Sequence, residues 1–130
     1  MKILIVDDEI EICSLFKNII ETYGHEIKLA SNGDAALDTY RKFRPDLVLM
    51  DYRMPGKDGL KTTEEIFNYD PEAQILFCSA DSSVKGKAME RGAVGFLQKP
   101  FDLEVLIDTI DIYEKKKVEV KKIKIDIIDE

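Results

Sequence analysis

Short apolar segments alternate along this chain with longer segments in which apolar residues recur every three or four positions. The short segments are of strand length and comprise residues 3–6, 27–30, 47–50, 75–78 and 94–97. The first, third and fourth are apolar at successive positions, which is typical of strands covered by helices on both faces. The pattern therefore predicts five strands separated by amphipathic helices.

The segments between and after these strands have helical periodicity. The shared apolar faces are formed by Ile12, Phe16, Ile19 and Tyr23 in the first helix, by Ala36, Tyr40 and Phe43 in the second, by Leu60, Thr63 and Phe67 in the third, and by Leu103, Leu106, Ile110 and Tyr113 in the last. The fourth helix is the weakest, because only Val84 and Ala88 align and Gly86 lies inside it. Each face gives its helix one side that can cover a sheet.

Regular alternation of strands and helices predicts an α/β protein with a parallel sheet and helices on both faces. With five strands we expect the flavodoxin-like, doubly wound (βα)₅ fold with strand order 2-1-3-4-5. In that topology the carboxyl ends of the first and third strands border a crevice, which is where such folds bind ligands.

Composition narrows the class of protein. The chain has 130 residues, about one domain, with 45% hydrophobic and 35% charged residues. The net charge of −7 argues against direct binding to nucleic acid, which requires a basic face. We expect the two cysteines, Cys13 and Cys78, to be packing residues that form no disulfide framework. No signal-peptide pattern or membrane-length apolar run is visible, so we expect a cytoplasmic protein without membrane contact.

Acidic residues stand at the two strand ends that border the expected crevice. Asp7 and Asp8 follow the first strand, and Asp51 follows the third. Ser79 and Lys99 follow the fourth and fifth strands. Three carboxylates repel one another unless a cation or a proton neutralises them.

The charges and donors at these strand ends suit phosphoryl chemistry. Three carboxylates and one lysine carry a net formal charge of −2, which a Mg²⁺ ion would balance, and Mg²⁺ prefers oxygen ligands. A carboxylate beside Mg²⁺ can attack a phosphoryl group and form an aspartyl phosphate. Lys99 and the hydroxyl of Ser79 could then contact the transferred oxygens.

Taken singly, each of these residues has an ordinary explanation. Asp8 alone is best explained as an N-cap of the first helix, and Ser79 as a cap or strand-end hydroxyl. Asp51 could be a loop acid, and Lys99 a solvated surface lysine. Jointly, these explanations require four independent coincidences at adjacent strand ends, so we favour the functional interpretation.

Four separated motifs resemble the receiver domain of two-component response regulators, of the single-domain, CheY-like kind. The motifs are Asp7-Asp8, Asp51 followed by Met54-Pro55-Gly56-Lys57-Asp58-Gly59, Ser79-Ala80, and Lys99-Pro100-Phe101. The resemblance covers residues 1–116. It implies that Asp51 is the phosphoacceptor, that Asp8 and Asp51 bind Mg²⁺ directly, and that Asp7 acts mainly through water.

The resemblance also assigns supporting roles. The backbone carbonyl of Arg53 is a further metal ligand, Ser79 is the switch hydroxyl, and Lys99 contacts a phosphoryl oxygen. The remaining switch and tuning positions are Ala80, Asp81, Phe96 and Pro100, of which Pro100 follows a peptide bond that is usually cis. Arg53 could pair with Asp81 or shield the acyl phosphate, so we expect slow to moderate self-dephosphorylation. Phe96 lacks a hydroxyl and is expected to prefer a buried pose.

By this resemblance the chain accepts a phosphoryl group from a histidine kinase or histidine phosphotransfer protein and switches a surface that binds a downstream protein. It would catalyse only its own phosphorylation and dephosphorylation. An N-terminal receiver fragment of a longer DNA-binding regulator is an alternative. So is a Mg²⁺-dependent phosphatase, although such enzymes need an acid at the position of Arg53. A flavin-binding module is disfavoured, because acids occupy the loop after the first strand.

Residues 117–130 form a C-terminal extension in which apolar and polar residues alternate. Val118 and Val120, and then Ile123, Ile125 and Ile127, alternate with polar residues, which predicts one or two strands. A helical continuation is the alternative. We expect the extension to serve as a linker or to support self-association. If the chain forms a dimer, the other candidate interface is the surface formed by the fourth helix, fifth strand and fifth helix. His25 is expected at the surface.

Overall fold

The structure is a computed structural model that describes the backbone of residues 1–129 and the side chains of residues 1–127. Its elements follow one another in the order β1 (Lys2–Val6), α1 (Ile10–Glu21), β2 (Glu26–Ala30), α2 (Gly33–Phe43), β3 (Leu47–Asp51), α3 (Gly59–Tyr69), β4 (Ile75–Ser79), the 3₁₀ turn η1 (Ser82–Val84), α4 (Lys85–Glu90), β5 (Gly95–Gln98) and α5 (Leu103–Asp129). The chain divides into two units, Met1–Pro100 and Phe101–Glu130, which are described separately below.

The first unit contains one five-stranded parallel sheet in the order β2-β1-β3-β4-β5, which confirms the predicted fold class. Val6 pairs with Met50 across β1 and β3, so Asp7, just beyond β1, and Asp51, the last residue of β3, follow neighbouring positions of the sheet. Asp51 pairs with Cys78, and Ser79 pairs with Gln98. The carboxyl ends of four strands are therefore aligned at one edge.

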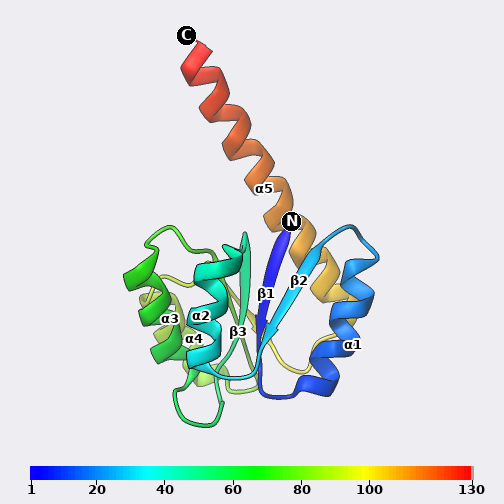
Figure 1. Cartoon of the computed structure of the whole chain (residues 1–130), viewed down its shortest axis with the longest axis vertical. Coiled ribbons are helices and arrows are strands. Elements are labelled where there is room, and N and C mark those ends of the chain that lie inside the picture. Colours follow the sequence, from blue (N-terminus) through cyan, green and yellow to red (C-terminus); the bar gives the residue numbers. More distant parts are fainter. Residues whose placement is uncertain (130) are drawn as a thin grey trace. The chain divides into compact units, whose positions relative to one another are not determined.

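Helices cover both faces of the sheet within the first unit. Figure 1 shows α2, α3 and α4 on one side of the strands and α1 on the other. Alternate strand residues, among them Leu4, Val48 and Phe77, share one core cluster with Ala36 and Ile66 of the helices. Burial on both faces explains why β1, β3 and β4 are apolar at successive positions.

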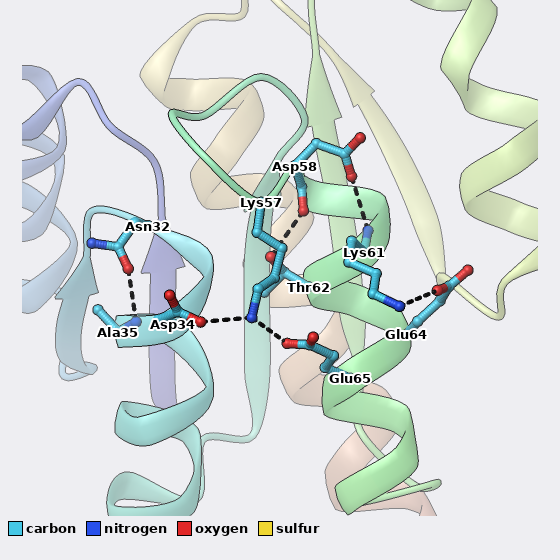
Figure 2. A network of polar contacts seen from close by, with 9 residues as sticks. All are labelled: Asn32, Asp34, Ala35, Lys57, Asp58, Lys61, Thr62, Glu64 and Glu65. Carbon is cyan, nitrogen blue, oxygen red and sulfur yellow. Dashed lines mark hydrogen bonds and ion pairs between the residues drawn. The ribbon is translucent and has the colours of Figure 1, made fainter.

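Side-chain caps define where α2 and α3 begin. Asn32 Oδ1 accepts a hydrogen bond of 2.8 Å from the backbone N–H of Ala35, and Asp58 Oδ1 accepts one of 2.9 Å from that of Lys61 (Figure 2). Each cap satisfies a backbone donor that the first helical turn leaves unpaired. Asp58 thus ends the loop after β3 and starts α3 at the same residue.

The apolar face of α1 differs in part from the prediction, since Phe16 and Ile19 are half-buried. Cys13 and Ile20 are the buried residues, whereas Ile12 and Tyr23 are 49% and 59% exposed. Apolar residues are spread widely around this helix, so periodicity alone did not select the buried side. In α2 the predicted face is confirmed, because Ala36, Tyr40 and Phe43 are all buried.

The predicted strands in residues 117–130 are wrong, and the helical alternative is correct through residue 129. α5 runs without interruption over Leu103–Asp129, while residue 130 lies outside the described part of the chain. Each residue added to an existing helix gains a hydrogen bond without a new nucleation cost. The penalty for a β-branched residue is only a few tenths of a kcal/mol, so continuation prevails. Among the described residues, no helix combines the length and apolar character of a membrane span.

His25 is buried rather than at the surface, and this expectation was also wrong. Its Nδ1 lies 2.9 Å from the N-terminal amino group, and its side chain retains only 7% exposure. The backbone N–H of Glu26 donates to the carbonyl of Met1, which brings the start of β2 against the start of β1. The amino group of Met1 is therefore one neighbour of the buried imidazole.

Candidate functional site

Three carboxylates converge where β1 and β3 end. Asp7, Asp8 and Asp51 each present an oxygen, and these oxygens lie within 4.8 Å of one another. Asp51 is buried, Asp7 is half-buried and Asp8 is exposed, so the cluster extends from the sheet edge to the solvent. The predicted convergence of acids is confirmed.

Lys99 brings the one ammonium group that the structure records in contact with these acids. Its Nζ lies 2.8 Å from Asp7 Oδ2 and 3.2 Å from Asp51 Oδ1, and the side chain is 25% exposed. The backbone N–H of Lys99 donates to the carbonyl of Ser79, and the bond from Lys99 to Pro100 is cis. Lys99 therefore lies against the acidic cluster, and the alternative of a solvated surface lysine is excluded.

The charges in the site shift one another's ionisation. Burial and the neighbouring charge of Asp7 raise the pKa of Asp51, and the contact with Lys99 only partly offsets this. Burial lowers the pKa of Lys99, but its hydrogen bonds and charge pairing with Asp7 and Asp51 outweigh burial and raise it. The site thus holds more negative charge than its lysine neutralises.

Asp8 does not serve as a helix cap. The N-cap position of α1 is Glu9, and it makes no side-chain capping bond. The carboxylate that binds the backbone there is Asp7, whose Oδ1 accepts a hydrogen bond of 2.9 Å from the N–H of Glu9. The alternative explanation of Asp8 as an N-cap is therefore wrong. Three carboxylates, excess negative charge and one open side form a donor set that suits a hard divalent cation.

Gly59 allows the loop after β3 to return to the strand it left. Its backbone N–H donates a hydrogen bond of 2.7 Å to the carbonyl of Tyr52, and a methyl group on Gly59 would collide with the carbonyl oxygen of Asp51. Gly56, earlier in the loop, has a φ of +78°, which favours glycine. The sequence marks this segment as a turn but does not show that Gly59 contacts Asp51.

Lys57 anchors the same loop and was not predicted as a site residue. Its Nζ lies 2.7 Å from Asp34 Oδ1 of α2 and 2.6 Å from Glu65 Oε2 of α3 (Figure 2). These two hydrogen bonds raise the pKa of Lys57. Since Asp34 is 23 residues away along the chain, local sequence spacing does not predict the contact. Lys57 therefore ties the loop beside Asp51 to both flanking helices.

The Ser79 segment lies at the end of β4. Ser79 is buried, and its Oγ accepts a hydrogen bond of 3.0 Å from the backbone N–H of Asp81. Ala80 is exposed, and its carbonyl accepts from the side chain of Gln98 at 2.9 Å. These bonds hold the strand end in a defined turn with Ser79 one residue beyond the partner of Asp51.

Arg53 and Asp81 form the pair that the sequence suggested. Arg53 Nη2 lies 3.5 Å from Asp81 Oδ2, with the arginine side chain 80% exposed. Hydrogen bonds from the Ser83 hydroxyl and backbone, and then the contact with Arg53, lower the pKa of Asp81. An ion pair this exposed contributes little to stability.

Phe96 packs against the core, and both cysteines are buried. The ring of Phe96 is partly buried and stacks on Phe77, with centroids 6.5 Å apart and planes 17° apart. Cys13 and Cys78 are buried thiols without a disulfide, and burial raises the pKa of each to about 12. Burial of both side chains confirms the packing interpretation, and a raised thiol pKa disfavours the reactive thiolate.

Comparison with known proteins matches residues 3–111 to the family model described as the response regulator receiver domain. The chain is 34% identical over 117 residues to the chemotaxis protein CheY of Thermotoga maritima, covering 88% of this chain and 98% of that protein. It is 39% identical over 106 residues to the transcriptional regulatory protein ZraR of Klebsiella oxytoca, covering 80% of this chain but 24% of that protein. The response regulator protein TrrA of Thermotoga maritima, solved with Mg²⁺ and BeF, superposes with a TM-score of 0.78 at 32% identity and covers 86% of this chain and 97% of that one.

Proposed function

Because the chain belongs to the response regulator receiver domain family, which works in two-component signalling, we propose that it accepts a phosphoryl group on Asp51. The donor is the phosphohistidine of a histidine kinase or of a histidine phosphotransfer protein. The observation that carries this proposal is the convergence of Asp7, Asp8 and Asp51, with the ammonium of Lys99 in contact with Asp7 and Asp51. The acceptor is the most buried of the three acids.

We propose that the carboxylates hold Mg²⁺. The donor set fits, since it offers carboxylate oxygens with uncompensated negative charge and one open side. Asp8 and Asp51 would bind the ion directly, Asp7 would act mainly through water, and the backbone carbonyl of Arg53 would add an oxygen. When bound, Mg²⁺ neutralises charge on the acids and on the incoming phosphoryl oxygens. TrrA, a similar protein by sequence and structure, was solved as a complex with Mg²⁺ and BeF.

The side chains of the site have distinct roles in the transfer. An oxygen of Asp51 attacks phosphorus, so that an O–P bond forms while the N–P bond of the phosphohistidine breaks. The electron pair of that bond stays on the ring nitrogen, and the imidazole leaves in its neutral form, with the proton that its other ring nitrogen already carried. Lys99, already beside Asp51, stabilises a phosphoryl oxygen as charge develops on it. Ser79, whose Oγ accepts a hydrogen bond from the Asp81 N–H, donates its hydroxyl hydrogen to another phosphoryl oxygen. Movement of Ser79 toward the phosphoryl group would therefore act on the turn after β4 through that bond.

The switch then changes a surface that binds a downstream protein. Phe96 packs on Phe77 in the strand that ends at Ser79, so movement of the Ser79 turn reaches this ring pair. Arg53 and Asp81 lie beside the site and slow the approach of water to the acyl phosphate, so self-dephosphorylation is slow to moderate. The chain catalyses only these reactions of its own acceptor. The alternative is that the same phosphoacceptor chemistry operates in a receiver domain that is part of a longer regulator. The similarity to ZraR supports this alternative, because the match covers 24% of that protein.

The test is incubation with acetyl phosphate and Mg²⁺, followed by intact-mass measurement. We expect one added phosphoryl group, lost when Mg²⁺ is chelated and absent in Asp51→Asn. Asp108→Asn, which removes an exposed acid of α5, should label like the wild-type chain and controls for charge alone. Repeated hydrolysis of a small phosphorylated metabolite, in place of single labelling, would instead establish the phosphatase alternative.

A further inference from the structure

The C-terminal half of α5 carries apolar side chains that are exposed to solvent. Val120, Ile123 and Ile127 are 50%, 57% and 65% exposed. They are spaced by three and then four residues, so they line one side of the helix. An exposed apolar stripe of this kind generally marks a surface that is covered by a partner.

The stripe has the spacing of a coiled-coil seam. With Val120 and Ile127 at heptad position a, Ile123 falls at d, and the preceding heptad places Tyr113 at a and Lys116 at d. Lysine at one core position weakens such a seam and helps to fix its register, while its long apolar stem can lie along the seam with the ammonium in water.

Charges beside the seam discriminate between the two orientations of a second copy. Glu119 is at position g and Lys124 at position e, so a parallel partner places Glu119 of each copy beside Lys124 of the other. An antiparallel partner would instead bring Glu119 near Asp126 and Lys117 near Lys124, which are like charges. The pattern therefore favours a parallel pair of identical helices.

We propose that two copies of this chain associate in parallel through residues 113–127 of α5. The seam spans only about two heptads, and a short seam with one lysine forms a weak dimer, because association must offset lost rotational and translational freedom. The inference concerns the C-terminal unit and does not rest on Asp51, so its failure would leave the proposed phosphotransfer intact.

A matched pair of substitutions tests which side of the helix associates. Val118 and Val120 are both exposed, at 61% and 50%, but Val118 is at heptad position f, opposite the seam. In analytical ultracentrifugation of the full chain between about 10 µM and 1 mM, a range suited to a weak dimer, we expect reversible dimerisation. Val120→Ser should weaken dimerisation at least ~tenfold, and Val118→Ser less than ~twofold. Equal helix content by circular dichroism shows that both variants fold.

Charge reversal tests the parallel orientation. Glu119→Lys and Lys124→Glu should each remain monomeric, since either change places like charges together, whereas their mixture should form the mixed dimer. A monomeric wild-type chain across this range, or equal weakening by Val118→Ser and Val120→Ser, would overturn the proposal. So would binding of a monomeric chain to phosphatidylglycerol vesicles, which would assign the lysine-rich helix to an anionic membrane surface.

Discussion

Replacing Asp51 by Asn is expected to stabilise the metal-free protein while strongly reducing its stabilisation by Mg²⁺. The reason is that Asp51 is buried beside Asp7 and Asp8, and burial and Asp7 raise its pKa. A raised pKa means that folding disfavours the ionised form. The charge of Asp51 therefore lowers the free energy of unfolding at neutral pH.

The size of this effect follows from the distances. At 4.8 Å and an effective dielectric constant of ~20, two like charges repel by about 3.5 kcal/mol, and Asp51 has two acidic neighbours at or within this separation. The attraction between Asp51 and Lys99, whose charged atoms are 3.2 Å apart, offsets about 5 kcal/mol of this repulsion at the same dielectric constant. The remaining repulsion is ~2 kcal/mol, and solvent around the exposed Asp8 reduces it, so we expect a gain of ~1–2 kcal/mol.

The assay is urea unfolding of wild type and Asp51→Asn at pH 7, with chelator or with Mg²⁺. In chelator the variant should have the higher midpoint. Mg²⁺ at about tenfold excess over its dissociation constant should stabilise wild type by ~1.4 kcal/mol and Asp51→Asn by much less. Asp108→Asn should match wild type in both conditions.

The pH dependence has a defined sign. Because the folded pKa of Asp51 lies above the unfolded value of ~3.9, folded wild type binds more protons in that window. Wild type should therefore lose stability relative to Asp51→Asn as the pH rises above about 4, until Asp51 is fully ionised. A variant less stable than wild type in chelator, or equally stabilised by Mg²⁺, would refute this reasoning.

Three further changes test the surrounding structure by urea unfolding. Gly59→Ala should lose roughly 2–4 kcal/mol through overlap with the backbone of β3, whereas Gly86→Ala, with open space around it, should gain ~0.5–1 kcal/mol; equal effects would contradict the close approach. Lys57→Met should lower the free energy of unfolding by ~1 kcal/mol and bind Mg²⁺ more weakly, because the loop beside the acceptor loses both carboxylate contacts. Unchanged stability and Mg²⁺ affinity would show that these contacts do not stabilise the loop. Tyr40→Phe should lose ~1 kcal/mol at pH 7, since its hydroxyl donates to Asp70 at 2.7 Å. That bond lowers the pKa of Asp70, so the difference should vanish as the pH falls below about 4, and a constant difference would contradict it.

The order of the strands could be predicted because alternation and burial leave few topologies. The buried side of α1 could not, since apolar residues such as Leu15, which is exposed, and Ile20, which is buried, lie on different faces of the helix. The extension was ambiguous for a related reason. Apolar residues at 123, 125 and 127 satisfy a strand period of two, and those at 120, 123 and 127 satisfy a helical one. Local pattern did not reveal that α5 simply continues.

The carboxylates and Lys99 could be predicted as a site because parallel strands end together, whatever the loops do. Lys57 and Gly59 could not, because their contacts depend on the path of the loop after β3. The contact of His25 with the N-terminal amino group was missed for a similar reason, since the two residues are 24 positions apart along the chain. Long-range contacts of loops and termini are therefore the part that sequence pattern does not encode locally.

The acceptor itself can be identified chemically. After reaction with acetyl phosphate and Mg²⁺, borohydride reduces an aspartyl phosphate to homoserine, which peptide mass spectrometry places at a single position. We expect homoserine at position 51, only when phosphodonor and Mg²⁺ are both present. Homoserine at position 7 or 8, or a borohydride-resistant phosphate on Ser79, would contradict the assignment of Asp51 as the phosphoacceptor.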